Sequence, residues 1–168
     1  KGGVLYFQDT PIFWSPWVSF SLNNQRKSGF LAPTIGTTST SGLMLSAPYY
    51  WNIAPNMDAV IASRVFSRRG LQVAGEFRHL DYYSNTQARV EVMPHDIVKN
   101  DSRYGYSLQH QQVFGRGFSG TLNLSGVSDD TYFTDISSRS TITSQTQLLR
   151  QGVFAYGNDW LTANVIGQ

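Results

Sequence analysis

A glycine-rich step is the first feature of this chain that could perform chemistry. Residues 115–120 read G-R-G-F-S-G, and G-x-G-x-x-G can bind the pyrophosphate of a dinucleotide when a strand precedes it and a helix follows it. The residues that follow, T-L-N-L-S-G, alternate in polarity as a strand does. We therefore expect the glycines to form a turn between two strands, and we predict no cofactor.

Three histidines are the next residues that could act as ligands or catalysts. His79, His95 and His110 are far apart in the sequence and lack the H-E-x-x-H spacing of a zinc site. The chain has no cysteine, which excludes thiolate ligands and disulfides within it. We predict no metal site, no catalytic residue and no enzymatic activity. A hydrolase stays open as a hypothesis, and it needs a serine, a histidine and an acid within hydrogen-bond reach.

The composition indicates what kind of scaffold carries these residues. Charged residues make up 14% and aromatic residues 14% of the chain, whereas about 25% of residues are charged in ordinary globular domains. This balance suits a transmembrane β-barrel, whose strands alternate apolar-out and polar-in. The net charge of +2 is too small to indicate nucleic-acid binding. No signal peptide opens the chain, so we expect an exported protein of this kind to be made as a longer precursor.

Polarity alternation predicts about eight to ten antiparallel strands, most of them about 9–12 residues long, which is enough to cross a bilayer at a tilt. No helix is predicted. The expected strands include residues 29–35, 42–50, 58–66, 71–82, 87–92, 103–114, 118–127, 139–150 and 160–167. An open sheet edge is costly in lipid, so either about eight strands close into a small barrel or the chain is the front of a larger one.

Charged residues recur on the polar faces of neighbouring expected strands. We predict that they line a lumen, where they either pair across strands or form a hydrophilic wall for a passing polar group. These predicted lumen-lining residues are Arg64, Glu76, Arg78, Arg89 and Glu91.

Two prolines and an aromatic run mark the first two barrel strands. Pro33 and Pro48 lie inside adjacent expected strands, and proline has no N–H to donate to a ladder, so this pairing should be weak. Tyr49, Tyr50 and Trp51 lie beside an expected turn at residues 51–55. Such a cluster is typical of the aromatic girdle at a membrane interface, although an aromatic core cluster is the alternative.

Several motifs also carry a family resemblance. The stretch R-K-S-G-F-L-A-P at residues 26–33 and the run P-Y-Y-W-N-I-A-P-N-M-D-A at residues 48–59 resemble the opening of the barrel of the LPS-assembly protein LptD family, the outer-membrane lipopolysaccharide translocons. The R-R-G step at 68–70, the E-F-R segment at 76–78 and V-S-D-D-T-Y-F-T-D at 127–135 fit the same family in the same order.

This resemblance implies an all-β fold in two parts. Residues 1–25 would be the end of a periplasmic β-jellyroll and a hinge, and residues 26–168 the N-terminal part of an outer-membrane β-barrel larger than this chain can build. It also implies lipopolysaccharide transport into the outer leaflet of the outer membrane of a Gram-negative bacterium, with lateral exit through a weakened seam. Pro33 and Pro48 occupy the family's proline positions at that lateral gate.

The implied partners are lipopolysaccharide, membrane lipid, a plug lipoprotein inside the barrel and a periplasmic jellyroll bridge protein, with no nucleic acid. The alternative function is that of a small β-barrel or β-sandwich module that binds glycan or lipid. A module of that kind would be monodisperse in water without detergent, whereas a barrel section would not.

Overall fold

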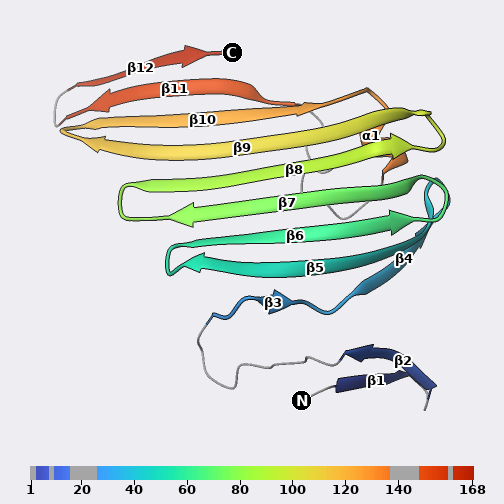
Figure 1. Cartoon of the computed structure of the whole chain (residues 1–168). Coiled ribbons are helices and arrows are strands. Elements are labelled where there is room, and N and C mark those ends of the chain that lie inside the picture. The colour runs from blue at the N-terminus through green and yellow to red at the C-terminus, as the bar shows by residue number, and fades with distance from the viewer. Residues whose placement is uncertain (1–2, 8–9, 16–25, 137–147, 159–160) are drawn as a thin grey trace.

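The computed structural model describes residues 3–7, 10–15, 26–136, 148–158 and 161–168, and these are almost entirely β-structure (Figure 1). β1 (Gly3–Phe7) and β2 (Thr10–Ser15) form a two-stranded antiparallel sheet. All the other strands belong to one ten-stranded sheet. The all-β prediction is therefore confirmed, while the expected polar hinge at residues 21–26 lies outside the described residues except for Arg26.

The large sheet is an antiparallel meander in which, from β4 onward, each strand pairs with the next one along the chain, while β3 pairs with β5. Its edges in the described residues are β12 on one side and the pair β3 and β4, which both bond to β5, on the other (Figure 1). The sheet does not close on itself there, which contradicts the alternative of a small closed barrel of about eight strands. Its strands are β3 (Gly29–Phe30), β4 (Thr34–Thr38), β5 (Gly42–Ala54), β6 (Met57–Phe66), β7 (Gly70–Leu80), β8 (Ser84–Asp96), β9 (Asp101–Gly115), β10 (Phe118–Val127), β11 (Arg150–Gly157) and β12 (Thr162–Gly167).

The strand boundaries differ from expectation in three places. The strand expected at residues 29–35 is split into β3 and β4. Of the turn expected at 51–55, residues 51–54 are instead the end of β5, and the turn lies at residues 55–56. The loop expected at 94–102 shrinks to residues 97–100, because β8 and β9 extend into it. Of the strand expected at 139–150, residues 139–147 lie outside the described residues. Cross-strand hydrogen bonds extend these strands beyond the ends of their alternating patterns.

One short helix, α1 (Tyr132–Asp135), was not predicted. It lies in the segment after β10, and its Tyr132 packs with Phe66, Met93 and Ile136 in a small buried cluster. We call the face of the sheet on which α1 packs the inner face and the opposite one the outer face. No helix within the described residues is long and apolar enough to cross a membrane.

The two faces differ in polarity as the alternation predicts. Leu45, Val65 and Leu71 lie directly opposite one another on β5, β6 and β7, and about half of each side chain is exposed on the outer face. The same face carries Tyr106 on β9, which is also exposed. The inner face instead carries charged and amide side chains. Apolar residues thus cover one exposed side of the sheet, as a lipid-facing wall requires.

The glycine-rich step forms the turn between β9 and β10, as predicted. Gly115, Arg116 and Gly117 have φ angles of 83°, 53° and 86°, a left-handed conformation that glycine adopts without steric cost. Gly117 also approaches the next hairpin, since a Cβ there would collide with the carbonyl oxygen of Gly157, whereas a Cβ on Gly115 would meet nothing within 4 Å.

We therefore expect Gly117→Ala to destabilise the fold more than Gly115→Ala. Both variants force alanine into the left-handed region, at about 1–2 kcal/mol, but the Gly117 variant adds a collision with backbone. The measurement is the midpoint of urea unfolding in detergent, followed by tryptophan fluorescence. Equal midpoints for the two variants would contradict the close approach of the two hairpins.

Candidate functional site: a broken sheet edge and a charged inner face

The edge of the sheet is irregular where the two prolines lie. Phe30 pairs with Tyr49 and Thr34 pairs with Ser46, so three residues of the edge (31, 32 and 33) face two residues of β5 (47 and 48). This extra residue is a bulge that separates β3 from β4. Pro33 lies in the break itself, not inside a strand as expected.

The direction in which the backbone carbonyl of Pro48 points shows which strand pairing this proline weakens. The amide of Leu31 donates a 2.9 Å hydrogen bond to the carbonyl oxygen of Pro48. In an antiparallel ladder the N–H and C=O of one residue point to the same neighbour. The N–H that proline lacks would therefore have pointed at the edge segment as well. Pro48 thus removes a donor from the pairing between β5 and the edge, and Pro33, which lies in the break beside it, has no N–H to donate either.

A buried carboxylate holds the start of this edge. Asp58, only 3% exposed on β6, accepts hydrogen bonds from Arg78 at 2.7 Å and from the hydroxyl of Tyr50 at 3.2 Å. It also pairs with Arg26 at 3.4 Å. Asn52 on β5 adds two hydrogen bonds. Its backbone N–H donates to Ser28 Oγ at 2.8 Å, and its side-chain Nδ2 donates to the carbonyl oxygen of Arg26 at 3.1 Å.

All five residues predicted to line a lumen lie on the inner face. Arg64 contacts Glu91 at 3.1 Å and Arg89 contacts Glu76 at 3.2 Å, each across strands. Arg78 pairs with Asp58, which the prediction missed, and its side chain remains 48% exposed. The structure thus brings each of these charges together with an opposite one. Whether they line a transport path stays a prediction.

A second charged cluster lies at the opposite end of the inner face, and the sequence reasoning did not anticipate it. Arg103 on β9, with a side chain 2% exposed, contacts Asp96 at 3.0 Å, Asp129 at 2.8 Å and Asp135 at 3.2 Å. Arg69 contacts Asp96 at 2.7 Å. These contacts tie residues 128–136, which we call the docked loop, to the turns that end β6 and β8. The sequence does show a loop with three aspartates, but nothing in it indicates that buried arginines would pair with them.

Tyr132 anchors the middle of the docked loop. Its ring is fully buried and lies against Gly105, where a Cβ would approach the ring to 3.1 Å. Its hydroxyl donates to Glu91 at 2.9 Å and accepts from Gln72 at 3.2 Å. Burial and the nearby Glu91 carboxylate raise the pKa of Tyr132 far above its usual range, so the ring remains neutral.

Asp129 holds the start of the docked loop as an anion. Burial alone would raise its pKa, but hydrogen bonds from Arg103, Ser128 and Thr131 outweigh this and hold the pKa well below its usual range. The carboxylate therefore stabilises the folded loop only while it is charged.

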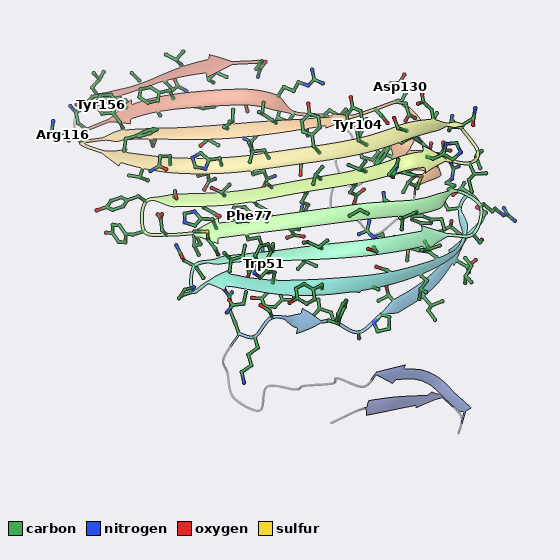
Figure 2. The ribbon with its side chains drawn as sticks, viewed as in Figure 1. Trp51, Phe77, Tyr104, Arg116, Asp130 and Tyr156 are labelled. Carbon is green, nitrogen blue, oxygen red and sulfur yellow. The ribbon has the colours of Figure 1, made fainter. Side chains whose placement is uncertain are left out.

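The predicted aromatic girdle is divided between the faces. Phe77 and Trp51 lie on the outer face with Tyr49, whereas Tyr50 points to the inner face and bonds to Asp58. Adjacent residues of a strand point to opposite faces, so the three consecutive aromatic residues do not form one cluster. Trp51, Phe77 and Tyr156 lie toward the sheet end at which Arg116 turns the chain, opposite to Tyr104 and Asp130 (Figure 2).

Further aromatic residues gather at this same end. Phe118 stacks with Phe154 at 5.8 Å and contacts Tyr156 at 4.6 Å. Tyr82 and Tyr83, in the turn after β7, contact each other at 4.8 Å. Sequence reasoning missed these residues, although their positions beside glycine-containing or polar turns were a usable signal.

Within the described residues, no group of three or more His, Cys, Asp or Glu side chains has an arrangement that could hold a metal ion, and the absence of a metal site stays a prediction. His79 does lie 3.5 Å from Ser84 Oγ through Nδ1 and 3.5 Å from Asp81 Oδ2 through Nε2, and both separations exceed the usual hydrogen-bond range of about 2.7–3.2 Å. Asp81 uses its other oxygen to cap the turn, at 2.7 Å from the amides of Tyr83 and Ser84. This geometry on an exposed turn gives no specific support to the hydrolase hypothesis, and the absence of enzymatic activity stays a prediction.

Comparison with known proteins gives one consistent result. Residues 101–168 match the family model described as LPS transport system D. The whole chain is 48% identical to the LPS-assembly protein LptD of Aromatoleum aromaticum, over 22% of that protein, and to that of an Azoarcus species, over 21% of it. The LPS-assembly protein LptD of Bordetella pertussis is 44% identical over 89% of this chain and 19% of its own length. The chain thus spans about a fifth of the length of the curated relatives that it matches.

Arg103→Met should release the docked loop. The change leaves Asp96 and two loop aspartates without their shared cation, and breaking a buried ion pair costs about 3–5 kcal/mol. A spin label on Asp130→Cys, an exposed loop position, should become mobile in this variant. The matched control is Arg116→Met, at an exposed turn of the opposite end, which should leave the label unchanged. An immobile label in the Arg103 variant would contradict this account.

The same label should report an acid transition. Because the pKa of Asp129 is depressed in the fold, its contribution is complete above the unfolded pKa of about 3.9 and is lost as the pH falls toward the folded value. We therefore expect constant mobility from pH 7 to about pH 5 and rising mobility below about pH 4. A transition centred near pH 6 would indicate that a histidine controls the loop instead.

Proposed function

Because the chain belongs to the LPS transport system D family, we propose that it is a section of an outer-membrane barrel that delivers lipopolysaccharide to the cell surface. The barrel lies in the outer membrane of a Gram-negative bacterium. Residues 26–168 supply the first barrel strands, and residues 1–25 end a periplasmic jellyroll that hands lipopolysaccharide over. The open meander of ten strands supports this role, since further strands can continue such a sheet into a larger barrel.

The observation that carries the proposal is the weakened edge. Lipid A has to leave the barrel sideways into the membrane, and the saccharide has to cross the lumen with it. Sideways exit needs a seam that parts at low cost. Pro33 and Pro48 lower the number of hydrogen bonds beside the first barrel strand, and each bond contributes about 0.5–1.5 kcal/mol net in water. We assign the lateral gate to this strand.

The inner face supplies a hydrophilic wall for the saccharide and its phosphates. Glu76, Glu91, Arg64 and Arg89 compensate one another across strands, so the wall is polar without a large net charge. Arg78 differs because half of its side chain is exposed while Asp58 fixes its position. It is the residue of this set best placed to contact a passing phosphate.

The outer face supplies contact with membrane lipid. Exposed apolar side chains run along β5, β6 and β7. Trp51, Phe77 and Tyr156 form an aromatic girdle toward one end (Figure 2), with Tyr49 on the same face of β5 as Trp51. We place a plug lipoprotein inside the completed barrel and a periplasmic jellyroll bridge protein before residues 1–25, as partners of the full-length protein.

Replacing both prolines tests the gate. Pro33→Ala with Pro48→Ala restores two possible donors at the edge, which should stiffen the seam and slow the appearance of lipopolysaccharide on the cell surface. Surface labelling after a pulse of synthesis measures the rate, at matched protein levels. The control is Pro94→Ala, in β8 and away from the edge, which should leave the rate unchanged. Unchanged surface delivery in the double variant would remove the gate role of the prolines.

A further inference from the structure

The edge segment is attached to β5 by quite different contacts along its length. At its start, the Asp58 and Asn52 contacts hold residues 26–28, and the Phe30 ring lies 5.1 Å from that of Tyr49. We call this region the base. Side chains carry most of this attachment, and their strength does not depend on a regular ladder.

The other end of the segment is held by the docked loop. Ser41, in the turn between β4 and β5, is 1% exposed, and its hydroxyl donates a 2.7 Å hydrogen bond to the carbonyl oxygen of Asp135. Asp135 is in turn held by Arg69, Arg103 and Lys99 at 3.5, 3.2 and 3.7 Å. Arg68 adds a 2.7 Å bond to the carbonyl of Ser39. We call this region the tip.

Between base and tip the attachment is sparse. Within the described residues, the bond from Leu31 to Pro48 is the one backbone hydrogen bond that residues 31–33 make to β5. The bulge and both prolines lie at this point. The edge segment is therefore attached by several contacts at each end and by few contacts at its centre.

We propose that the gate strand opens by bending at residues 31–33 while its base and tip stay attached to β5, and that Asp58 and Ser41 are the positioning residues that secure the two ends. This inference rests on the transport role proposed above and deepens it, because it states which part of the gate moves. It also links the docked loop to the gate through Ser41. Neither end peels away from β5 during export.

Two engineered disulfides test where the strand moves. The chain contains no cysteine, so an introduced pair is the only cysteine pair within these residues, and the pairs are placed in the full-length protein at directly opposite positions. The base pair is Phe30→Cys with Tyr49→Cys, and the tip pair is Ile35→Cys with Leu45→Cys. Both pairs join the edge to β5 on the outer face, one on each side of the break.

With either disulfide formed, we expect the rate of surface delivery of lipopolysaccharide to stay within about fivefold of the rate in the reduced protein. One net hydrogen bond changes an equilibrium between two states by about this factor. A larger loss on oxidation of either pair, reversed by a reductant, would overturn the proposal, because that end must then part during export. If the disulfides block delivery while the proline double variant still slows it, the transport role stands and this inference fails. If the proline variant has no effect, the gate itself is misassigned.

Spin labels test the two positioning residues. Asp58→Asn should raise the mobility of a label on Phe30→Cys and leave one on Ile35→Cys unchanged, whereas Ser41→Ala should do the reverse. The matched controls are Glu76→Gln, a paired inner-face carboxylate away from the edge, and Ser46→Ala, a buried serine of β5. Neither control should move either label. A general loss of stability would mobilise both labels together, and that result would overturn the assignment.

Leakage provides a functional readout of the same residues. Loosening one end should admit a large hydrophilic antibiotic that the membrane normally excludes, and the disulfide at that end should suppress the uptake. Asp58→Asn should thus be rescued by the base pair but not by the tip pair, and Ser41→Ala by the tip pair but not by the base pair. Rescue by either pair in both variants would overturn the separate roles of the two ends.

Discussion

In the proposed membrane setting, the backbone hydrogen bonds of the sheet are the constraint on which the rest of this structure depends. Hydrocarbon offers no partner to an N–H or C=O group, so each unpaired group costs several kcal/mol. An antiparallel meander meets this demand with short turns, and most of the chain follows it from β5 to β12. The ladder also shifts register near residues 52–54, 93–96 and 118–119, but at residues 31–33 the edge strand itself is interrupted, and such an irregularity has to be offset elsewhere.

Side-chain contacts on both sides of the break offset the hydrogen bonds that are missing at residues 31–33. Asp58 is a buried charge, and three polar partners compensate it. Ser41 is buried at the other end and bonded to a loop that two buried arginines hold. Buried ion pairs are weak contributors to net stability but define geometry well, since a displaced partner leaves a charge uncompensated. That property suits contacts that must keep a strand in register while its centre is weak.

The charged side chains on the inner face are also compensated by nearby opposite charges. β6, β7 and β8 carry charges that are matched across strands, while β9 beyond Arg103 and β10 carry amides and hydroxyls such as Gln109 and Asn123. Matched charges make this face hydrophilic without creating a strong field of one sign. Tyr132 and Ile136 cover part of this face with the only buried apolar cluster in the described residues, so the docked loop is held by packing as well as by charge.

The sequence by itself determined most of the sheet and its two faces. Alternation with period two is a local property, and it correctly predicted strands near β6, β7, β9 and β10, the turn at Gly115 to Gly117 and the shared face of Arg64, Glu76, Arg78, Arg89 and Glu91. The family motifs at residues 26–33 and 48–59 indicated the same relatives that the comparisons found. The tertiary structure alone decided that Pro48 faces the edge, that Tyr50 turns inward to Asp58, and that residues 128–136 dock on Arg103. Each of these depends on the register of strands or on contacts between residues distant in sequence, and periodicity within one strand carries no information about its neighbour.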